Sequence, residues 1–77
     1  MYWNYRRVDL APPEATEPWL EIREVYYDDD HTPLGHCSAA VGGENEKNLA
    51  ETYKLMAEAF ENPIIKASEF TSKIREH

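Results

Sequence analysis

The chain has 77 residues, with 15 acidic and 8 basic side chains and a formal net charge of −7. A chain this short forms one small domain and buries only ~60% of the surface that its unfolded form exposes. The acidic balance disfavours direct binding of nucleic acid, because Arg6-Arg7 is the only adjacent basic pair and is too small to form a basic patch. An acidic surface suits a basic protein partner, or it simply keeps the protein soluble.

The cysteine content and the apolar segments bear on the compartment. One cysteine, Cys37, cannot form an internal disulfide, so we expect a cytoplasmic protein in a reducing environment. The first residues contain no apolar stretch of signal-peptide length, and no segment approaches the ~18 apolar residues of a membrane span. We therefore predict no membrane association.

Three extended segments are predicted, at residues 2–8, 19–28 and 34–41. The first alternates aromatic, polar and basic residues, which places Trp3 and Tyr5 on one face. The second ends in a run of three aspartates followed by His31 and Pro33. Asp and His tolerate positive φ, and proline can open a strand, so the second and third segments are predicted to form a β-hairpin.

The apolar residues of the second segment change parity along its length. Leu20 and Ile22 point to one face of a strand, whereas Val25 and Tyr27 point to the other. Either both faces of the sheet are partly buried, or a bulge near Arg23 resets the register.

Residues 45–61 carry the pattern of an amphipathic helix. Asn45 is a candidate N-cap, and Asn62-Pro63 marks the end. One helical stripe is apolar and consists of Leu49, Tyr53, Met56 and Phe60. We expect this stripe to pack across one face of the sheet.

These segments predict an α+β fold, with a three-stranded antiparallel sheet packed by one main C-terminal helix. Residues 1–66 are expected to form the domain, and residues 67–77 a tail that either packs beside it as a short frayed helix or stays free. The apolar residues expected to be buried are Leu20, Ile22, Val25, Leu49, Tyr53, Met56, Phe60 and Ile64.

The residues with potential for chemistry do not form a recognisable site. Asp28 to Asp30 are consecutive and lack the glycine and the closing glutamate of a calcium loop. His31, His36 and Cys37 match no zinc spacing, and the last two face opposite sides of a strand, where Cys37 serves as a small buried residue. We predict no catalytic residue, no cofactor and no metal site, and hence no enzyme.

Aromatic residues are the remaining candidates for function. One helix can cover only one face of a sheet, so rings on the other face would form an exposed binding surface. The candidate interaction face is made of Trp3, Tyr5, Trp19, Tyr26 and Tyr27. The alternative is that these rings enlarge a small core.

Several short patterns resemble a group of uncharacterised short bacterial proteins. They are Trp3-Asn4-Tyr5-Arg6, Glu24-Val25-Tyr26-Tyr27-Asp28, Pro33, Gly43-Glu44 with Leu49, Met56 and Ala59, and Pro63-Ile64-Ile65. The resemblance covers most of the chain except residues 9–18 and the part after Lys66, and it implies no activity.

The order of strand, hairpin and single helix is also similar to that of HicB-type antitoxins. In that family a small sheet-and-helix domain neutralises a basic RNA-cleaving toxin, and the only sequence similarity is the Gly43-Glu44 lead into the helix. From these observations we predict a small non-catalytic interaction module that self-associates through its sheet as a homodimer. The alternative is an antitoxin-like protein that masks a basic toxin.

Overall fold

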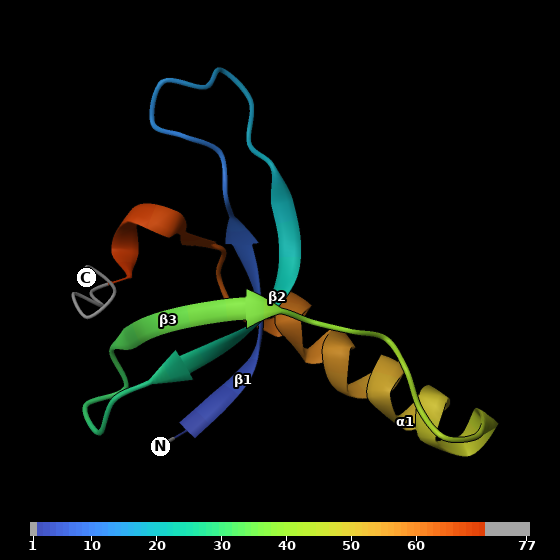
Figure 1. Ribbon diagram of the computed structural model, residues 1–77. Helices are drawn as coiled ribbons and strands as arrows, with labels where there is room; N and C mark the ends of the chain where they lie inside the picture. Colours follow the sequence, from blue (N-terminus) through green and yellow to red (C-terminus); the bar gives the residue numbers. More distant parts are fainter. Residues whose placement is uncertain (1, 71–77) are drawn as a thin grey trace.

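The computed structural model describes residues 2–70, which form a four-stranded sheet with one α-helix (Figure 1). The strands are β1 (Tyr2–Asp9), β2 (Leu20–Tyr27), β3 (Pro33–Ser38) and β4 (Ile65–Lys66), in the spatial order β3-β2-β1-β4. β2 is antiparallel to both β1 and β3, whereas β4 lies parallel to β1. The predicted α+β class is confirmed, and the sheet is mixed because of a fourth strand that was not predicted.

Both faces of the sheet are partly buried. β1 and β2 pair without interruption from Tyr2–Tyr27 to Asp9–Leu20, so the change of parity in β2 is not caused by a bulge near Arg23. The register instead shifts between Tyr26 and Tyr27 on the side of β3. The first of the two sequence alternatives is therefore correct.

The helix face of the sheet, which carries Tyr5 and Ile22, is covered where the helix ends. Helix α1 (Glu46–Met56) is followed by the 3-10 helix η1 (Ala57–Glu61), so the predicted single helix over 45–61 changes type near its end. The buried residues here are Tyr5, Met56 and Ala59, with Ile22 and Ala39 packed against them.

Arg7 fastens η1 to this face of the sheet. Its Nε donates to the Ala59 carbonyl at 3.2 Å, and its Nη2 donates to the Asn62 carbonyl at 2.7 Å. These carbonyls lie at the end of the helix, where intrahelical partners are lacking. A strand arginine thus satisfies them and holds the helix end in place.

The tail face is the opposite side of the sheet. Its buried cluster consists of Val8, Val25, Tyr27 and Ile65, with Leu10 and Phe70 packed against it. Phe70 follows a short 3-10 helix, η2 (Ala67–Glu69), so the first part of the predicted tail packs beside the domain. Residues 71–77 of that tail lie outside the described residues.

The hairpin turn between β2 and β3 is held by Asp28. Its Oδ1 accepts hydrogen bonds from the backbone amides of Asp30 and Thr32, both at 2.9 Å. His31 adopts a φ of 63°, as the residue types of the turn predicted. The acidic run therefore has a structural role in closing the hairpin.

Helix α1 is mostly exposed, which corrects the expected packing. Of the described residues of α1, Met56 alone is buried, because only the C-terminal end of the helix reaches the sheet and the rest projects beyond it (Figure 1). Val25 and Met56 are buried as expected, and Ile22 is half-buried. The expectation was wrong for residues that are at least 40% exposed, namely Leu20, Leu49, Tyr53, Phe60 and Ile64.

Candidate interaction surface

An apolar groove lies where α1 meets the sheet. It has a volume of about 150 Å³ and is lined by Ile22, Val41, Tyr53, Met56, Ala57 and Phe60. Three of these side chains are largely exposed: Val41 at 56%, Tyr53 at 69% and Phe60 at 63%. The groove is uncharged and open to solvent, as expected of a docking surface for an apolar partner.

The segment from Ala39 to Asn45 runs back along α1, and the two together form a projecting arm (Figure 1). Gly43 lies against the start of the helix, since a Cβ atom at this position would be 2.5 Å from the Leu49 amide nitrogen. The close contact needs a residue without a side chain. The segment brings Val41 to the groove beside Tyr53.

The start of α1 is capped as the sequence predicted. The Asn45 side chain accepts a hydrogen bond from the Asn48 amide at 2.9 Å, and the Asn45 backbone is extended. Lys47, Glu51 and Lys54 recur at spacings of four and three residues, on the side of the helix away from Leu49 and Tyr53. These three charged residues therefore leave the apolar stripe free, whereas Glu46, seven residues before Tyr53, lies on the stripe side at the tip of the helix.

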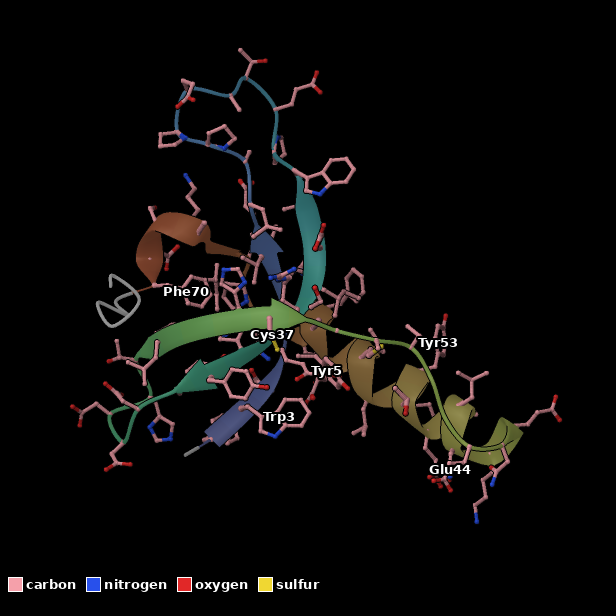
Figure 2. The ribbon with its side chains drawn as sticks, in the orientation of Figure 1. Trp3, Tyr5, Cys37, Glu44, Tyr53 and Phe70 are labelled. Carbon is pink, nitrogen blue, oxygen red and sulfur yellow. The ribbon has the colours of Figure 1, made fainter. Side chains whose placement is uncertain are left out.

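The structure does not bring the five predicted aromatic residues together. Trp3, Tyr5 and Tyr26 share the helix face, and the Trp3 ring meets the Tyr5 ring edge-on with centroids 5.3 Å apart (Figure 2). Tyr5 is buried beneath η1, and Tyr27 is buried on the tail face. Trp19 precedes β2 and is 64% exposed. Only part of this set remains available to a partner.

Cys37 is exposed on the helix face, which corrects the expectation that it is a buried residue. The Tyr26 hydroxyl donates to Glu24 Oε1 at 2.8 Å, and the Cys37 Sγ lies 3.6 Å from both groups. The hydrogen bonds to Cys37 and to Glu24 raise the pKa of Tyr26 well above its ordinary value. Neither neighbour of the thiol is a cation, which a reactive thiolate usually needs.

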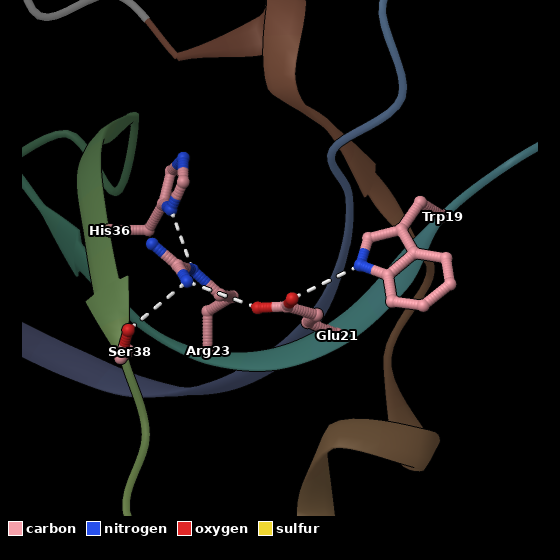
Figure 3. Close-up of polar contacts among 5 residues, drawn as sticks. All are labelled: Trp19, Glu21, Arg23, His36 and Ser38. Atoms are coloured by element: carbon pink, nitrogen blue, oxygen red, sulfur yellow. Dashed lines mark hydrogen bonds and ion pairs between the residues drawn. The ribbon is translucent and has the colours of Figure 1, made fainter. Parts of the chain in front are cut away.

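A polar network on the tail face centres on Arg23 (Figure 3). Its Nη1 lies 3.1 Å from Glu21 Oε1, and its Nε donates to His36 Nδ1 at 2.9 Å. Burial, and then the nearby Arg23 charge, lower the pKa of His36. Hydrogen bonds from Trp19 and then from Arg23 lower the pKa of Glu21. This network joins β2 to β3.

Among the described residues, neither His31 nor His36 belongs to a group of three side chains that could bind a metal ion. Within residues 2–70, no three His, Cys, Asp or Glu side chains are close enough together to hold one. His36 and Cys37 pair with Val25 and Glu24, so they lie on opposite faces of the sheet. In the same part of the chain, no helix has the length and apolar character needed to cross a membrane.

Comparisons of the chain with protein-family models, with curated protein sequences and with solved structures gave no match.

Val41 and Ala57 line the groove but were not among the residues predicted for a site. Val41 was assigned to the third strand, but β3 ends at Ser38 and the chain turns toward α1. Ala57 follows Tyr53 by one helical turn, so the helical period carried a signal for it. The position of Val41 depends on the path of a loop, for which the sequence contains no comparable periodicity.

Proposed function

We propose that the protein is a small, non-catalytic interaction module that self-associates through the apolar groove and the exposed stripe of α1. The observation that carries the proposal is the exposure of this stripe on a helix that projects from the sheet. The proposed interface lies on α1, whereas the sequence-based expectation placed it on the aromatic residues of the sheet. Tyr5 and Tyr27 are buried, whereas Tyr53 and Phe60 are exposed.

The exposed area is large enough to support an interface. Val41, Leu49, Tyr53 and Phe60 are each more than 40% exposed. Together they expose roughly 400 Å² of side-chain surface, within the range of the largest apolar patch on a typical monomer, which is often functional. This is about half of the ~800 Å² that each partner contributes to a standard protein interface.

A partner would also support the helix itself. α1 has 11 residues, and isolated helices shorter than ~12–15 residues are marginal in water. Its own sheet supports only the end at Met56. A second copy of the chain is present wherever the protein is made and can cover the stripe, whereas the abundance of another partner varies. The uncharged lining of the groove also lets two acidic copies approach, because Lys47, Glu51 and Lys54 lie on the other side of the helix.

Light scattering coupled to size-exclusion chromatography, over a range of protein concentrations, tests the proposal. We expect the wild type to be dimeric, and Tyr53→Glu to weaken dimerisation roughly 30-fold or more, as for loss of a central aromatic contact worth ~2 kcal/mol. Lys54→Gln is the matched control, because it changes the net charge by the same amount on the charged side of the helix. A wild type that stays monomeric at all concentrations would contradict the proposal.

The antitoxin-like alternative remains a prediction from the sequence. The net charge of −7 favours a basic partner through electrostatic attraction. If the wild type captures a basic protein in stoichiometric amount and Tyr53→Glu does not, this alternative would replace self-association.

A further inference from the structure

We infer that the second copy binds through an antiparallel pairing of the two α1 helices about a two-fold axis at Tyr53. This inference rests on the proposed self-association and specifies its geometry. A two-fold axis makes each interface contact reciprocal, so one position on the axis faces its own counterpart. On either side of this axis, a residue that precedes Tyr53 in one copy faces the residue that follows Tyr53 by the same number of positions in the other copy.

Side-chain sizes match across such an axis. Leu49 lies four residues before Tyr53 and Ala57 four residues after it, so each leucine would face an alanine of the second copy. Ala50 lies three residues before Tyr53 and is exposed beside this axis, whereas its symmetric counterpart Met56 is buried against the protein's own sheet and makes no contact of this kind. Large residues then pack against small ones, which lets two helices approach closely. Leu49, Ala50, Tyr53 and Ala57 are all exposed and free to make these contacts.

Charge also favours the antiparallel orientation. The tip of the arm carries the exposed residues Glu44 and Glu46, whereas Arg7 lies at the other end, over the Phe60 ring at 5.2 Å. Antiparallel pairing places Glu46 of one copy opposite Phe60 and near Arg7 of the other. Parallel pairing would instead bring the two acidic tips together, which is unfavourable for like charges.

The shape of the molecule permits this arrangement. α1 projects beyond the sheet (Figure 1), so a second helix laid beside it in the opposite direction places the second sheet at the far end of the pair. The two sheets then lie at opposite ends of the helix pair and leave its centre accessible. Each helix supports the part of the other that its own sheet does not reach.

Cysteine cross-linking in a Cys37→Ser background tests the geometry, because Cys37 is the only cysteine of the chain. With a short bis-maleimide reagent, Tyr53→Cys should form a covalent dimer by itself. Leu49→Cys and Ala57→Cys should each fail to cross-link alone and should cross-link when the two proteins are mixed. Both proteins of the mixed pair retain Tyr53, so this part of the experiment remains informative even if Tyr53→Cys weakens the dimer. Lys54→Cys, on the charged side of α1, is the negative control.

The outcomes separate this inference from the proposed function. A wild-type protein that is monomeric by light scattering removes both. A dimeric wild type in which Leu49→Cys cross-links with itself indicates parallel helices and overturns the inference alone. A dimer with no cross-link at positions 49, 53 or 57, alone or mixed, indicates that another surface is used and also overturns it.

Discussion

At the residue scale, polar side chains hold together a sheet whose apolar core is small. Arg6 donates to the Tyr27 hydroxyl at 2.9 Å and to the Pro63 carbonyl at 2.7 Å. The Tyr27 hydroxyl in turn donates to Asn4 Oδ1 at 2.7 Å. The two bonds from Arg6 involve a charged group and carry more stability than neutral hydrogen bonds do. They link the segment after the helix to the first two strands.

The lowered pKa of His36 predicts a loss of stability in mild acid. An unfolded chain takes up a proton at the ordinary histidine pKa of 6.5, whereas in the folded chain burial of His36, and then the nearby Arg23 charge, lower this pKa. The stability that this site contributes is therefore present above pH 6.5 and is lost as the pH falls through the lower folded value. Urea unfolding at pH 7.5 and at pH 5.5 measures this effect.

His36→Gln is the control for the pH dependence. Glutamine cannot titrate in this range, so the variant should lose less stability between the two pH values than the wild type does. Equal losses in the two proteins would show that His36 is not responsible.

Two neighbouring glycines allow a matched test of the contact between the linker and α1. A Cβ on Gly43 would meet the backbone of Asn48 and Leu49, whereas a Cβ on Gly42 would meet nothing within 4 Å. Neither glycine has a positive φ, so backbone strain does not separate them. Gly43→Ala should destabilise the protein by ~1–3 kcal/mol, as overpacking does, and Gly42→Ala should be nearly neutral in chemical denaturation. An equal loss of stability in the two variants would exclude the contact between Gly43 and α1 as the cause.

At the element scale, the sequence predicted the hairpin and its turn well and the placement of the helix poorly. The turn depends on local conformational preferences of Asp28 and His31, which the sequence carries directly. The stripe of α1 shows which side of the helix is apolar, but it does not show whether its own sheet or another chain covers that side. β4 has only two residues, too few for a detectable alternation. The groove could not be predicted either, since it depends on the path of the chain after Ser38.

The exposure of α1 predicts that its helicity depends on protein concentration. A short helix that is supported by a second copy should lose helical content when dilution separates the copies. Far-UV circular dichroism at constant absorbance, in cells of different path length, measures this directly. Tyr53→Glu should reach the same helical content only at a protein concentration roughly 30-fold higher or more, in line with its weaker dimerisation. A wild-type spectrum that does not change across the dimer–monomer transition would show that α1 is stable without a partner.

At the scale of the whole molecule, the net charge of −7 opposes association of two copies although the groove itself is uncharged. Added salt screens this repulsion, since the Debye length falls from ~30 Å at 0.01 M to ~8 Å at 0.15 M. We therefore expect the dimer dissociation constant to fall several-fold between these salt concentrations, as measured by analytical ultracentrifugation. Binding of a basic protein would respond in the opposite direction and weaken with salt. The sign of the salt effect thus distinguishes the two partner classes.

The position of β4 beside β1 has a consequence for biosynthesis. Ile65 is 3% exposed and packs with Val8 and Val25, so the first strand completes its core only with a residue near the other end of the chain. A nascent chain on the ribosome can close the hairpin between β2 and β3 early, because those contacts are local. It cannot bury Val8 in the same way until Ile65 has left the exit tunnel. Folding of this domain is therefore expected to finish only when the segment through Ile65 has emerged, with the tail face exposed to chaperones until then.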